Sequence, residues 1–344
     1  MQSVLITGGA GFFGGLLKRA LLDKGYRCVS VDLQRDDDTH PQLVSVQGDI
    51  RNRSIMRDLF DTHDVAAVFH CAAILAHDRA QRGMLWSTNV DGTRMIADEA
   101  AAHGVSRIVF ISSNCLWGQG MHHPVTEDET PSPVDLYGRS KWEAERIVLQ
   151  TPSLHPVIIR CPTIIDEGRL GLLAILFAFI EEGRKVWTVG GGTNRYQFIY
   201  GQDLVDACLR AMQSGVSGVF HIGSDDVPLL RESYEEVIRR AGTAARVASL
   251  PAGIAIPAMK AAHALGISPL GPYHYKMIAE DFVFDTTRIK ARLQWQPTLS
   301  NTEMLWKAYE YYIAHRDEIA SRSSASAHRL PAKMGVIRLL KWIS

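Results

Sequence analysis

Short apolar runs alternate with amphipathic stretches along the first half of the chain. Val4, Leu5 and Ile6 form an apolar run of the kind found in buried parallel strands. Leu17 and Leu21, with the residues around them, then follow at helical spacing. The pattern therefore predicts a strand, a tight turn and a helix at the start of the chain.

The same alternation continues through the first 160 residues. Further strands are predicted at residues 27–31, 43–47, 67–71, 107–112 and 156–160, and helices at residues 54–61, 84–103 and 136–150. Alternating strands and helices imply an α/β fold, a doubly wound parallel sheet of the Rossmann type with helices on both faces. Ligands bind to such sheets at the carboxyl ends of the strands.

The pattern becomes less regular after Arg160. We expect a Rossmann domain over residues 1–160, a mixed region over 161–315 that holds the last Rossmann elements and a smaller substrate-binding part, and a tail over 316–344. Two apolar segments, residues 170–180 and 254–270, either line a substrate cleft or belong to the ordinary core.

The sequence TGGAGFFG, residues 7–14, lies between the first strand and the first helix. Glycines at positions 8, 11 and 14 let the backbone approach a pyrophosphate, whose charge meets the free amides at the helix N-terminus. Asp32 ends the second strand, at the distance where an acid that binds an adenosine ribose is expected. Its carboxylate would repel a 2′-phosphate, so we predict NAD rather than NADP, although Arg35 lies nearby. The alternative is an ordinary tight turn with a capping aspartate.

Tyr137 and Lys141 stand one helical turn apart in YGRSK. A phenol with a pKa near 10 is a poor base at neutral pH, but a neighbouring ammonium favours the phenolate. Such a pair alone is common on solvated helix faces. Downstream of a glycine loop, it indicates redox chemistry with a pyridine nucleotide.

Composition agrees with a soluble, cytoplasmic enzyme. The chain has 344 residues with 37 basic and 37 acidic side chains, which makes no electrostatic case for nucleic acid. Five scattered cysteines lack metal-ligand spacing and are expected as buried apolar residues in a reducing compartment. We predict no signal peptide, and the longest apolar run, residues 170–180, is too short to span a bilayer.

From about residue 2 to residue 312 the sequence resembles the extended short-chain dehydrogenases/reductases, specifically the NAD-dependent epimerase/dehydratase family. The motifs that carry the resemblance are TGGAGFFG, Asp32, GDIRN, HCAA, STNVDGT, SSNCLWG, YGRSK, FIYGQDL and GVFHIGS, in this order along the chain.

The resemblance implies a catalytic set of Ser113, Tyr137 and Lys141, with Ser113 chosen because it lies five residues before Gly118. It also implies NAD as cofactor and a small-molecule substrate. The cofactor contacts that it implies are Gly8, Gly11, Phe12, Phe13, Gly14, Asp32, Asp49, Ile50, Ala72, Ala73, Asn89, Ser112, Tyr137, Lys141 and Pro162. Ser112 has a second interpretation, as a residue that only caps its strand.

Substrate contacts are expected at Asn114, Cys115, Thr163, Arg195 and Tyr196. Related 4,6-dehydratases carry Asp-Glu where this chain has Asn114 and Cys115, which argues against dehydration. Nucleotide-sugar enzymes carry an asparagine near Thr163 and an arginine where this chain has Tyr196, with Arg195 displaced by one position. A guanidinium suits a diphosphate, so either Arg195 reaches the substrate or the pocket never binds a diphosphate.

These features leave three functions open. The first is an NAD-dependent epimerase of an activated sugar, and the second is a dehydrogenase or ketone reductase of the 3β-hydroxysteroid type. The third, a non-catalytic NAD-binding regulator, usually lacks the tyrosine or the lysine. By family analogy we expect a homodimer that pairs the helices at residues 84–103 and 136–150.

The C-terminal tail lies outside the resemblance. A serine-rich stretch from Ser321 resembles a flexible connector, and AKMGVIRLLKWIS follows with Met334, Ile337 and Leu340 at helical spacing. Either a terminal helix packs on protein, or a short basic helix makes weak contact with an anionic membrane surface.

Overall fold

A single sheet of seven parallel strands forms the centre of the protein. The computed structural model describes residues 2–75, 82–266 and 271–321. The strands follow the order β10-β6-β5-β4-β1-β2-β3. They are β1 (Ser3–Thr7), β2 (Arg27–Asp32), β3 (Leu43–Gln47), β4 (Val65–His70), β5 (Arg107–Ser113), β6 (His155–Cys161) and β10 (Gly218–His221). The predicted doubly wound parallel sheet is confirmed.

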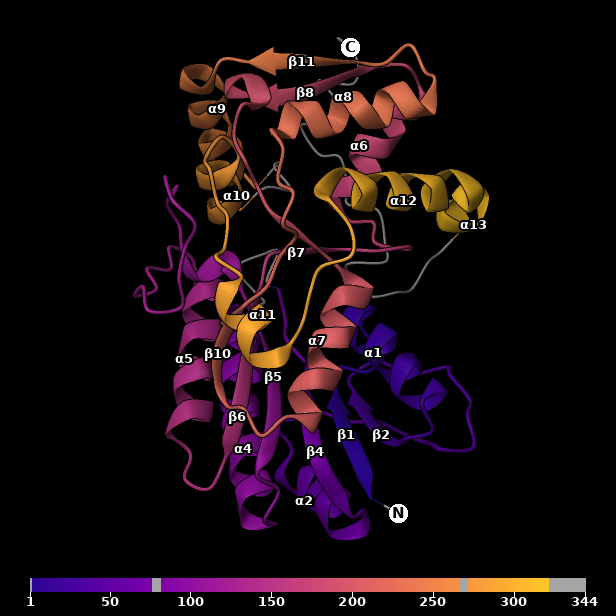
Figure 1. Ribbon diagram of the computed structural model, residues 1–344, viewed down its shortest axis with the longest axis vertical. Coiled ribbons are helices and arrows are strands. Elements are labelled where there is room, and N and C mark those ends of the chain that lie inside the picture. Colours follow the sequence, from indigo (N-terminus) through magenta and orange to yellow (C-terminus); the bar gives the residue numbers. More distant parts are fainter. Residues whose placement is uncertain (1, 76–81, 267–270, 322–344) are drawn as a thin grey trace.

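Helices cover both faces of this sheet (Figure 1). One face carries α1 (Phe12–Asp23) and α7 (Gly201–Gln213), and the other carries α2 (Arg53–Thr62), α4 (Gly92–Ala102) and α5 (Leu136–Gln150). Successive strand residues serve opposite faces, as expected of a strand buried on both sides. In β1, Val4 and Ile6 pack toward α1 and α7, whereas Leu5 packs on the other face, toward α2, α4 and α5.

A second part lies beyond the carboxyl ends of the strands (Figure 1). It contains two small parallel pairs, β7 (Thr163–Ile165) with β9 (Phe198–Tyr200), and β8 (Lys185–Val189) with β11 (Arg246–Leu250). Its helices are α6 (Leu172–Glu181), α8 (Leu230–Ala241), α9 (Ala252–Ala264), α10 (Pro272–Met277), α12 (Asn301–Ala314) and α13 (Arg316–Ser321). Helix α11 (Thr287–Leu293) lies beside β10, and 3-10 turns occur at Asn114–Leu116 and Gly190–Gly192.

The helix predicted over residues 84–103 is interrupted. The chain forms α3 (Arg82–Trp86), a π-helical turn at Ser87–Asp91, and then α4. A π turn inserts an extra residue and turns its side chains away from the helical register, and such turns often occur at functional sites. Here the turn carries Asn89.

The two apolar segments have different environments. In α6, side chains such as Phe177 and Ile180 are fully buried against α12, so the core interpretation is correct there. In α9, by contrast, Ile254 is 72% exposed, although Ala255 and Ala262 are buried. Leu265, directly after α9, is also largely exposed.

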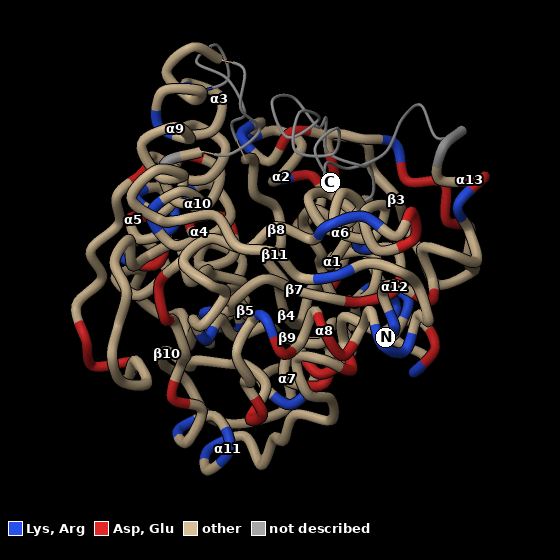
Figure 2. Tube along the Cα trace, turned by 90° about the horizontal axis from the view of Figure 1, so that it is seen from above, with Lys and Arg blue, Asp and Glu red and all other residues tan. Residues whose placement is uncertain are grey.

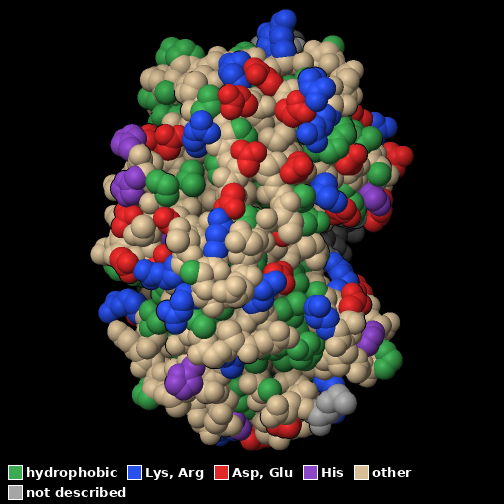
Figure 3. All heavy atoms as spheres, in the orientation of Figure 1, with side chains coloured by type: hydrophobic (Ala, Val, Ile, Leu, Met, Phe, Trp, Pro, Cys, Tyr) green, Lys and Arg blue, Asp and Glu red, His purple; other side chains and the backbone are tan. Residues whose placement is uncertain are grey.

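Lys and Arg are mixed with Asp and Glu over the backbone trace and over the face drawn with all atoms (Figures 2 and 3). Within the described part of the chain, no helix is long and apolar enough to cross a bilayer. All five cysteines are free, and Cys28, Cys161 and Cys208 are buried. The helix predicted after Pro331 lies outside the described residues, so its packing or membrane contact stays a prediction.

Candidate active site

The glycine loop joins β1 to α1 where the order of strands reverses, because β1 lies between β2 and β4. Gly8 has φ +76°, a conformation that favours glycine. A Cβ there would lie 2.8 Å from the Cα of Ala72, and a Cβ on Gly14 would overlap the carbonyl of Gly8. The loop therefore needs glycine at both positions: at Gly8 because the backbones after β1 and β4 meet, and at Gly14 because α1 packs on the backbone of Gly8.

Helix α1 presents its N-terminus to this crevice. Gly11 is the N-cap, no side chain caps the helix, and its first turn has no acidic residue. The amide groups of a first turn have no partner within the helix, and together with the helix dipole they attract an anion. This end of α1, with Phe12 and Phe13 in its first turn, is thus suited to a pyrophosphate.

Asp32 stands at the end of β2, beside the glycine loop. One carboxylate oxygen accepts a hydrogen bond from the Ala10 amide at 3.1 Å, and the other accepts from the Gln34 amide at 2.9 Å. The carboxylate therefore supports the loop, which is the alternative role of capping a turn. Its contact with an adenosine ribose stays a prediction.

Further acids follow Asp32 in the chain. The ammonium of Lys18, 1% exposed, forms ion pairs with Asp36 and Asp38 and ties this loop to α1. The side chain of Arg35 is 84% exposed, with only Asp37 as an ion-pair partner among the described residues. The acidic surroundings disfavour a 2′-phosphate, which agrees with the predicted preference for NAD.

Several predicted cofactor contacts also have partners within the protein. Asp49 pairs with Arg51, which holds the pKa of the Asp49 carboxyl below its usual value, and Ile50 is buried in the core. Asn89 accepts a hydrogen bond from the Ile74 amide at 2.8 Å and donates to the Ser140 hydroxyl at 3.0 Å. The π turn therefore lets Asn89 tie the loop after β4, which carries Ala72 and Ala73, to α5.

Ser113 and Tyr137 come together because β5 ends where α5 begins. The side chain of Asp135 caps α5 by accepting from the Gly138 amide at 2.8 Å. Gly138 itself packs so closely on the carbonyl of Cys115 that a side chain there would clash. The close packing of helix and loop brings the phenol of Tyr137 within hydrogen-bonding reach of the Ser113 side chain.

The pKa of Tyr137 does not follow the sequence-based expectation of a lowered value. Burial raises the pKa of the phenol well above its ordinary value, and the Cys115 and Cys161 thiols and Asp135 raise it further. The hydrogen bond with Ser113 acts in the opposite direction. The phenol therefore stays protonated in the protein alone, because low-polarity surroundings disfavour the phenolate.

Lys141 is buried in the second turn of α5. Its ammonium donates to the carbonyl of Ile111 at 2.6 Å and lies 4.1 Å from the centre of the Phe110 ring. Burial lowers the pKa of Lys141 to about 8, and the nearby Glu145 carboxylate partly offsets this. The lysine is thus oriented by β5.

A buried polar network behind the catalytic helix was not predicted. Glu145, 1% exposed, accepts from the Ser112 hydroxyl and from the Arg160 guanidinium, and Arg160 also contacts His221 at 3.3 Å. Ser112 consequently interacts with α5 through its hydroxyl and not only as a strand cap. Two features of the sequence could have indicated this network: Glu145 lies four residues after Lys141 on the same helix, and Arg160 lies inside an apolar strand.

The predicted substrate residues divide into two groups. The amide of Asn114 donates to the phenol of Tyr196 at 2.8 Å, and that phenol lies 2.8 Å from the hydroxyl of Tyr273, which the sequence analysis did not single out. Thr163 also hydrogen-bonds to Tyr196, and burial raises the pKa of Tyr196 to about 12. Thr163 follows Pro162, which is buried after β6.

Arg195 does not join this polar cluster. It is exposed, its guanidinium donates to the carbonyl of Val227, and its amide donates to Asp281 at 2.6 Å. Adjacent residues in an extended segment point to opposite sides, so Arg195 and Tyr196 cannot both face the pocket in this backbone register.

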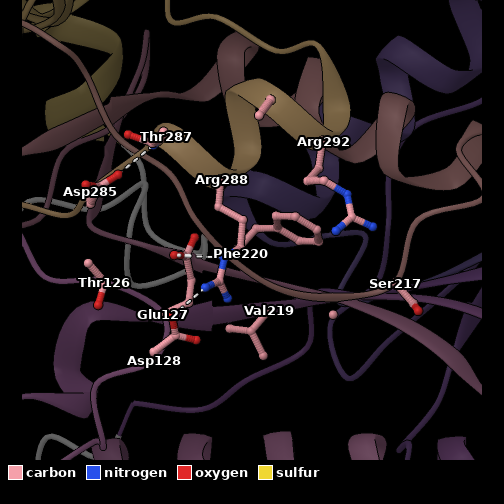
Figure 4. A pocket seen from close by; sticks show the side chains of 12 residues that line it. Thr126, Glu127, Asp128, Ser217, Val219, Phe220, Asp285, Thr287, Arg288 and Arg292 are labelled. Atoms are coloured by element: carbon pink, nitrogen blue, oxygen red, sulfur yellow. Dashed lines mark hydrogen bonds and ion pairs between the residues drawn. The ribbon is translucent and has the colours of Figure 1, made fainter.

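A separate cavity of about 530 Å³ lies beside β10 and α11 (Figure 4). None of the predicted site residues lines it. Arg288 bridges two of its carboxylates, Glu127 and Asp128, and Glu127 also accepts from the amide of His221 at 2.9 Å. These contacts stabilise the edge of the sheet and indicate no chemistry. Among the described residues, no group of His, Cys, Asp and Glu could hold a metal ion.

Comparison with known proteins agrees with this geometry. The model of the NAD dependent epimerase/dehydratase family matches residues 4–223. A protein of Sinorhizobium fredii described as uncharacterized protein y4nG is 34% identical over 345 residues, covering 99% of this chain and 86% of the relative. The UDP-glucose 4-epimerase of Neisseria gonorrhoeae is 30% identical over 263 residues, covering 65% of this chain and 78% of the relative.

Among solved structures, UDP-glucose 4-epimerase from Thermotoga maritima with UDP-glucose matches with a TM-score of 0.75 at 22% identity, covering 92% of this chain and 100% of that chain. This likeness supports the fold. The chain belongs to the NAD-dependent epimerase/dehydratase family. It is an NAD-dependent enzyme of the extended short-chain dehydrogenase/reductase type, and the glycine cradle, the uncapped start of α1 and Asp32 fit that cofactor.

Proposed function

We propose that this enzyme is an NAD-dependent sugar epimerase that acts on a nucleotide-linked or otherwise activated sugar through a transient ketone. The observation that carries the proposal is that Ser113, Tyr137 and Lys141 lie around the end of β5, at the same edge of the sheet as the glycine loop after β1. Relatives with matching sequence over much of this chain are UDP-glucose 4-epimerases.

NAD, when bound, supplies a reversible hydride acceptor. The hydroxyl of Ser113 would hold the substrate oxygen. Tyr137 is protonated in the protein alone, so it would act as the base only as the phenolate, which the Lys141 ammonium and the positive charge of oxidised NAD would favour, and it would then take the proton of the substrate hydroxyl. The ammonium of Lys141, one turn along α5, provides the positive charge that favours this transfer. For reduction of the ketone from its other face, Tyr137 would give the proton back to the substrate oxygen, which would complete the inversion of the carbon.

The residues after Ser113 support epimerisation over dehydration. Loss of water needs an additional acid and base beside the redox pair. Burial raises the pKa of the Cys115 thiol to about 12, and the Asn114 amide is held by Tyr196. Neither group is a useful proton donor or acceptor at neutral pH.

A second candidate is oxidation or reduction of an apolar alcohol or ketone, of the 3β-hydroxysteroid type. It is favoured by the aromatic cluster next to Asn114 and Tyr196, in which Trp117, Phe282 and Phe284 are almost fully buried. Arg195, which donates to a backbone carbonyl, also does not supply the expected diphosphate contact.

Proton nuclear magnetic resonance of the protein incubated with UDP-glucose tests the first proposal. We expect interconversion with UDP-galactose in deuterated water, with hydrogen rather than deuterium retained at the inverted carbon because the hydride returns within one active site. Other UDP-sugars extend the test if glucose is not the substrate. Net oxidation of NADH with apolar ketones, and no sugar turnover, would favour the second candidate.

Tyr137→Phe is the matched control. It removes the proton acceptor but keeps the ring, so NAD affinity should change little while turnover falls by about a hundredfold or more. Calorimetry measures the first quantity and the same resonance assay the second. Turnover equal to that of the unmodified protein would exclude Tyr137 as the base.

We also propose a homodimer that pairs residues 84–103, which form α3, the π turn and α4, with α5. Residues predicted for such an interface, including Ile96 and Ile147, pack on the protomer's own sheet. Met84, Trp86 and Leu149 on these helices are exposed, however, and offer an apolar surface. Light scattering should give a dimer mass, and a monomer for the variant in which Trp86 and Leu149 are both changed to Glu.

A further inference from the structure

Arg169 is held at a fixed place between the two parts of the protein. It closes a turn after β7, in which its amide donates to the carbonyl of Asp166 at 3.0 Å and Gly168 adopts φ +79°. Asp166 is almost fully buried and accepts from the Gln202 side chain of α7 at 3.2 Å. The turn is therefore anchored to the Rossmann part.

The guanidinium of Arg169 reaches the site already described. Its central carbon lies 5.6 Å from the centre of the Phe12 ring, in the first turn of α1. It also interacts electrostatically with Tyr137 and with Cys161 at the end of β6. A cation from the second part of the protein thus lies near both the first turn of α1, which is suited to a pyrophosphate, and the phenol of Tyr137.

This cation lacks an anionic partner within the protein. Over residues 2–75, 82–266 and 271–321, no carboxylate forms an ion pair with Arg169 and no group accepts a hydrogen bond from its guanidinium. The side chain is half-buried, and burial lowers the pKa of Arg169 to about 10. Placing a guanidinium in such surroundings is costly unless an anion accepts its hydrogen bonds.

The planar guanidinium presents paired donors that match phosphate oxygens. We propose that Arg169 binds a diphosphate where the second part of the protein meets the Rossmann part. Two diphosphates have the required chemistry: the pyrophosphate of the dinucleotide, next to Phe12, and the diphosphate of an activated sugar, next to Tyr137. The second source rests on the proposed sugar epimerase function, whereas the first does not. In either case Arg169, not Arg195, supplies a guanidinium to the site.

The test compares dissociation constants, so it does not depend on turnover. NAD and UDP are titrated separately by calorimetry into the full-length protein, Arg169→Gln, Arg169→Lys, and the control Arg239→Gln. Arg239 is exposed on α8 and pairs with Glu236, so this control removes the same charge outside the site. Adenosine and uridine, which have no phosphate, are the ligand controls.

Loss of one charge-assisted contact should weaken binding of the affected diphosphate about tenfold or more in Arg169→Gln, with partial recovery in Arg169→Lys. Weakened NAD binding identifies the cofactor as the source, and weakened UDP binding identifies the substrate. Nucleoside binding and the Arg239→Gln protein should be unaffected. Unchanged affinity for both diphosphates would overturn the proposal.

The unmodified protein provides a second measurement in case the variants fold poorly. Phenylglyoxal modifies accessible arginines, and peptide mass spectrometry reports the extent at Arg169. Saturating NAD or UDP should protect Arg169 but not Arg239, and equal modification with and without both ligands contradicts the proposal. Absence of sugar turnover with NAD-dependent protection intact would refute the epimerase function while leaving the role of Arg169 in place.

Discussion

His70, at the end of β4, should make the protein sensitive to acid. It is fully buried, stacks on Phe110, and its ring nitrogens lie 2.7 Å from the Thr7 hydroxyl and 2.8 Å from the Thr93 hydroxyl. The Thr93 hydroxyl donates to the carbonyl of Asn89 at 2.7 Å, so it accepts from Nε2 of His70. Nδ1 then accepts from Thr7, and this arrangement suits the neutral ring.

The size of the effect follows from the change in pKa on folding. Burial, together with the nearby Lys141 ammonium, lowers the pKa of His70 from 6.5 to about 3. Between these values the unfolded chain binds a proton that the native protein does not, so the free energy of unfolding falls as pH falls. One such histidine lowers it by about 2 kcal/mol between pH 7 and pH 5, with a slope near ~1.3 kcal/mol per pH unit at the acid end.

Urea unfolding followed by tryptophan fluorescence at several pH values between 7 and 5 measures this slope. His70→Gln cannot titrate, so its free energy of unfolding should be lower at pH 7 but should decline less steeply between pH 6 and 5, by about 1.3 kcal/mol per pH unit. His103→Gln is the control. Contacts with Glu99 and Asp61 raise the pKa of His103, so this histidine adds stability as the pH falls through 6.5, the opposite of the effect of His70. Between pH 6 and 5 the unfolded chain is already mostly protonated at His103, so His103→Gln should change the slope there only slightly. If the free energy of unfolding depends on pH equally in His70→Gln and in the unmodified protein, His70 is not held neutral in the native state.

Three further predictions concern the glycine loop, the buried ion pair behind α5 and the carboxylate of Asp32. Gly14→Ala places a methyl group against a backbone carbonyl and should weaken NAD binding at least tenfold or unfold the loop, whereas Gly253→Ala, in open space, should do neither; calorimetry and thermal melting distinguish these results. Glu145→Ala leaves the buried Arg160 without its carboxylate and should cost about 3–5 kcal/mol in urea unfolding, and a loss below 1 kcal/mol would show that the pair contributes little. Asp32→Ala should narrow the ratio of NAD to NADP affinity, and an unchanged ratio would show that Asp32 supports only the loop.

Local sequence patterns predicted the Rossmann part well. Apolar runs bounded by glycine or polar residues predicted every strand of the sheet from β1 to β6. A strand that is buried on both faces needs apolar side chains at successive positions, and this run is easily recognised in a sequence. The helix predicted at residues 136–150 has the same bounds as α5. The glycines at positions 8 and 14 were predictable because a side chain at Gly8 would meet the loop after β4, and one at Gly14 would meet the backbone of Gly8.

The tertiary structure decided which side chains meet and how they titrate. YGRSK suggested a phenol activated by its lysine, but packing directs Lys141 to the Ile111 carbonyl and burial raises the pKa of Tyr137. Arg169 lies in the turn after β7 and Tyr273 in the short helix α10, and no sequence periodicity marks either residue. Their approach to Tyr137 and Tyr196 depends on how the second part of the protein packs over the strand ends. Sequence spacing determines the conformation of neighbouring residues, whereas burial and contacts between distant segments arise only when the whole chain has folded.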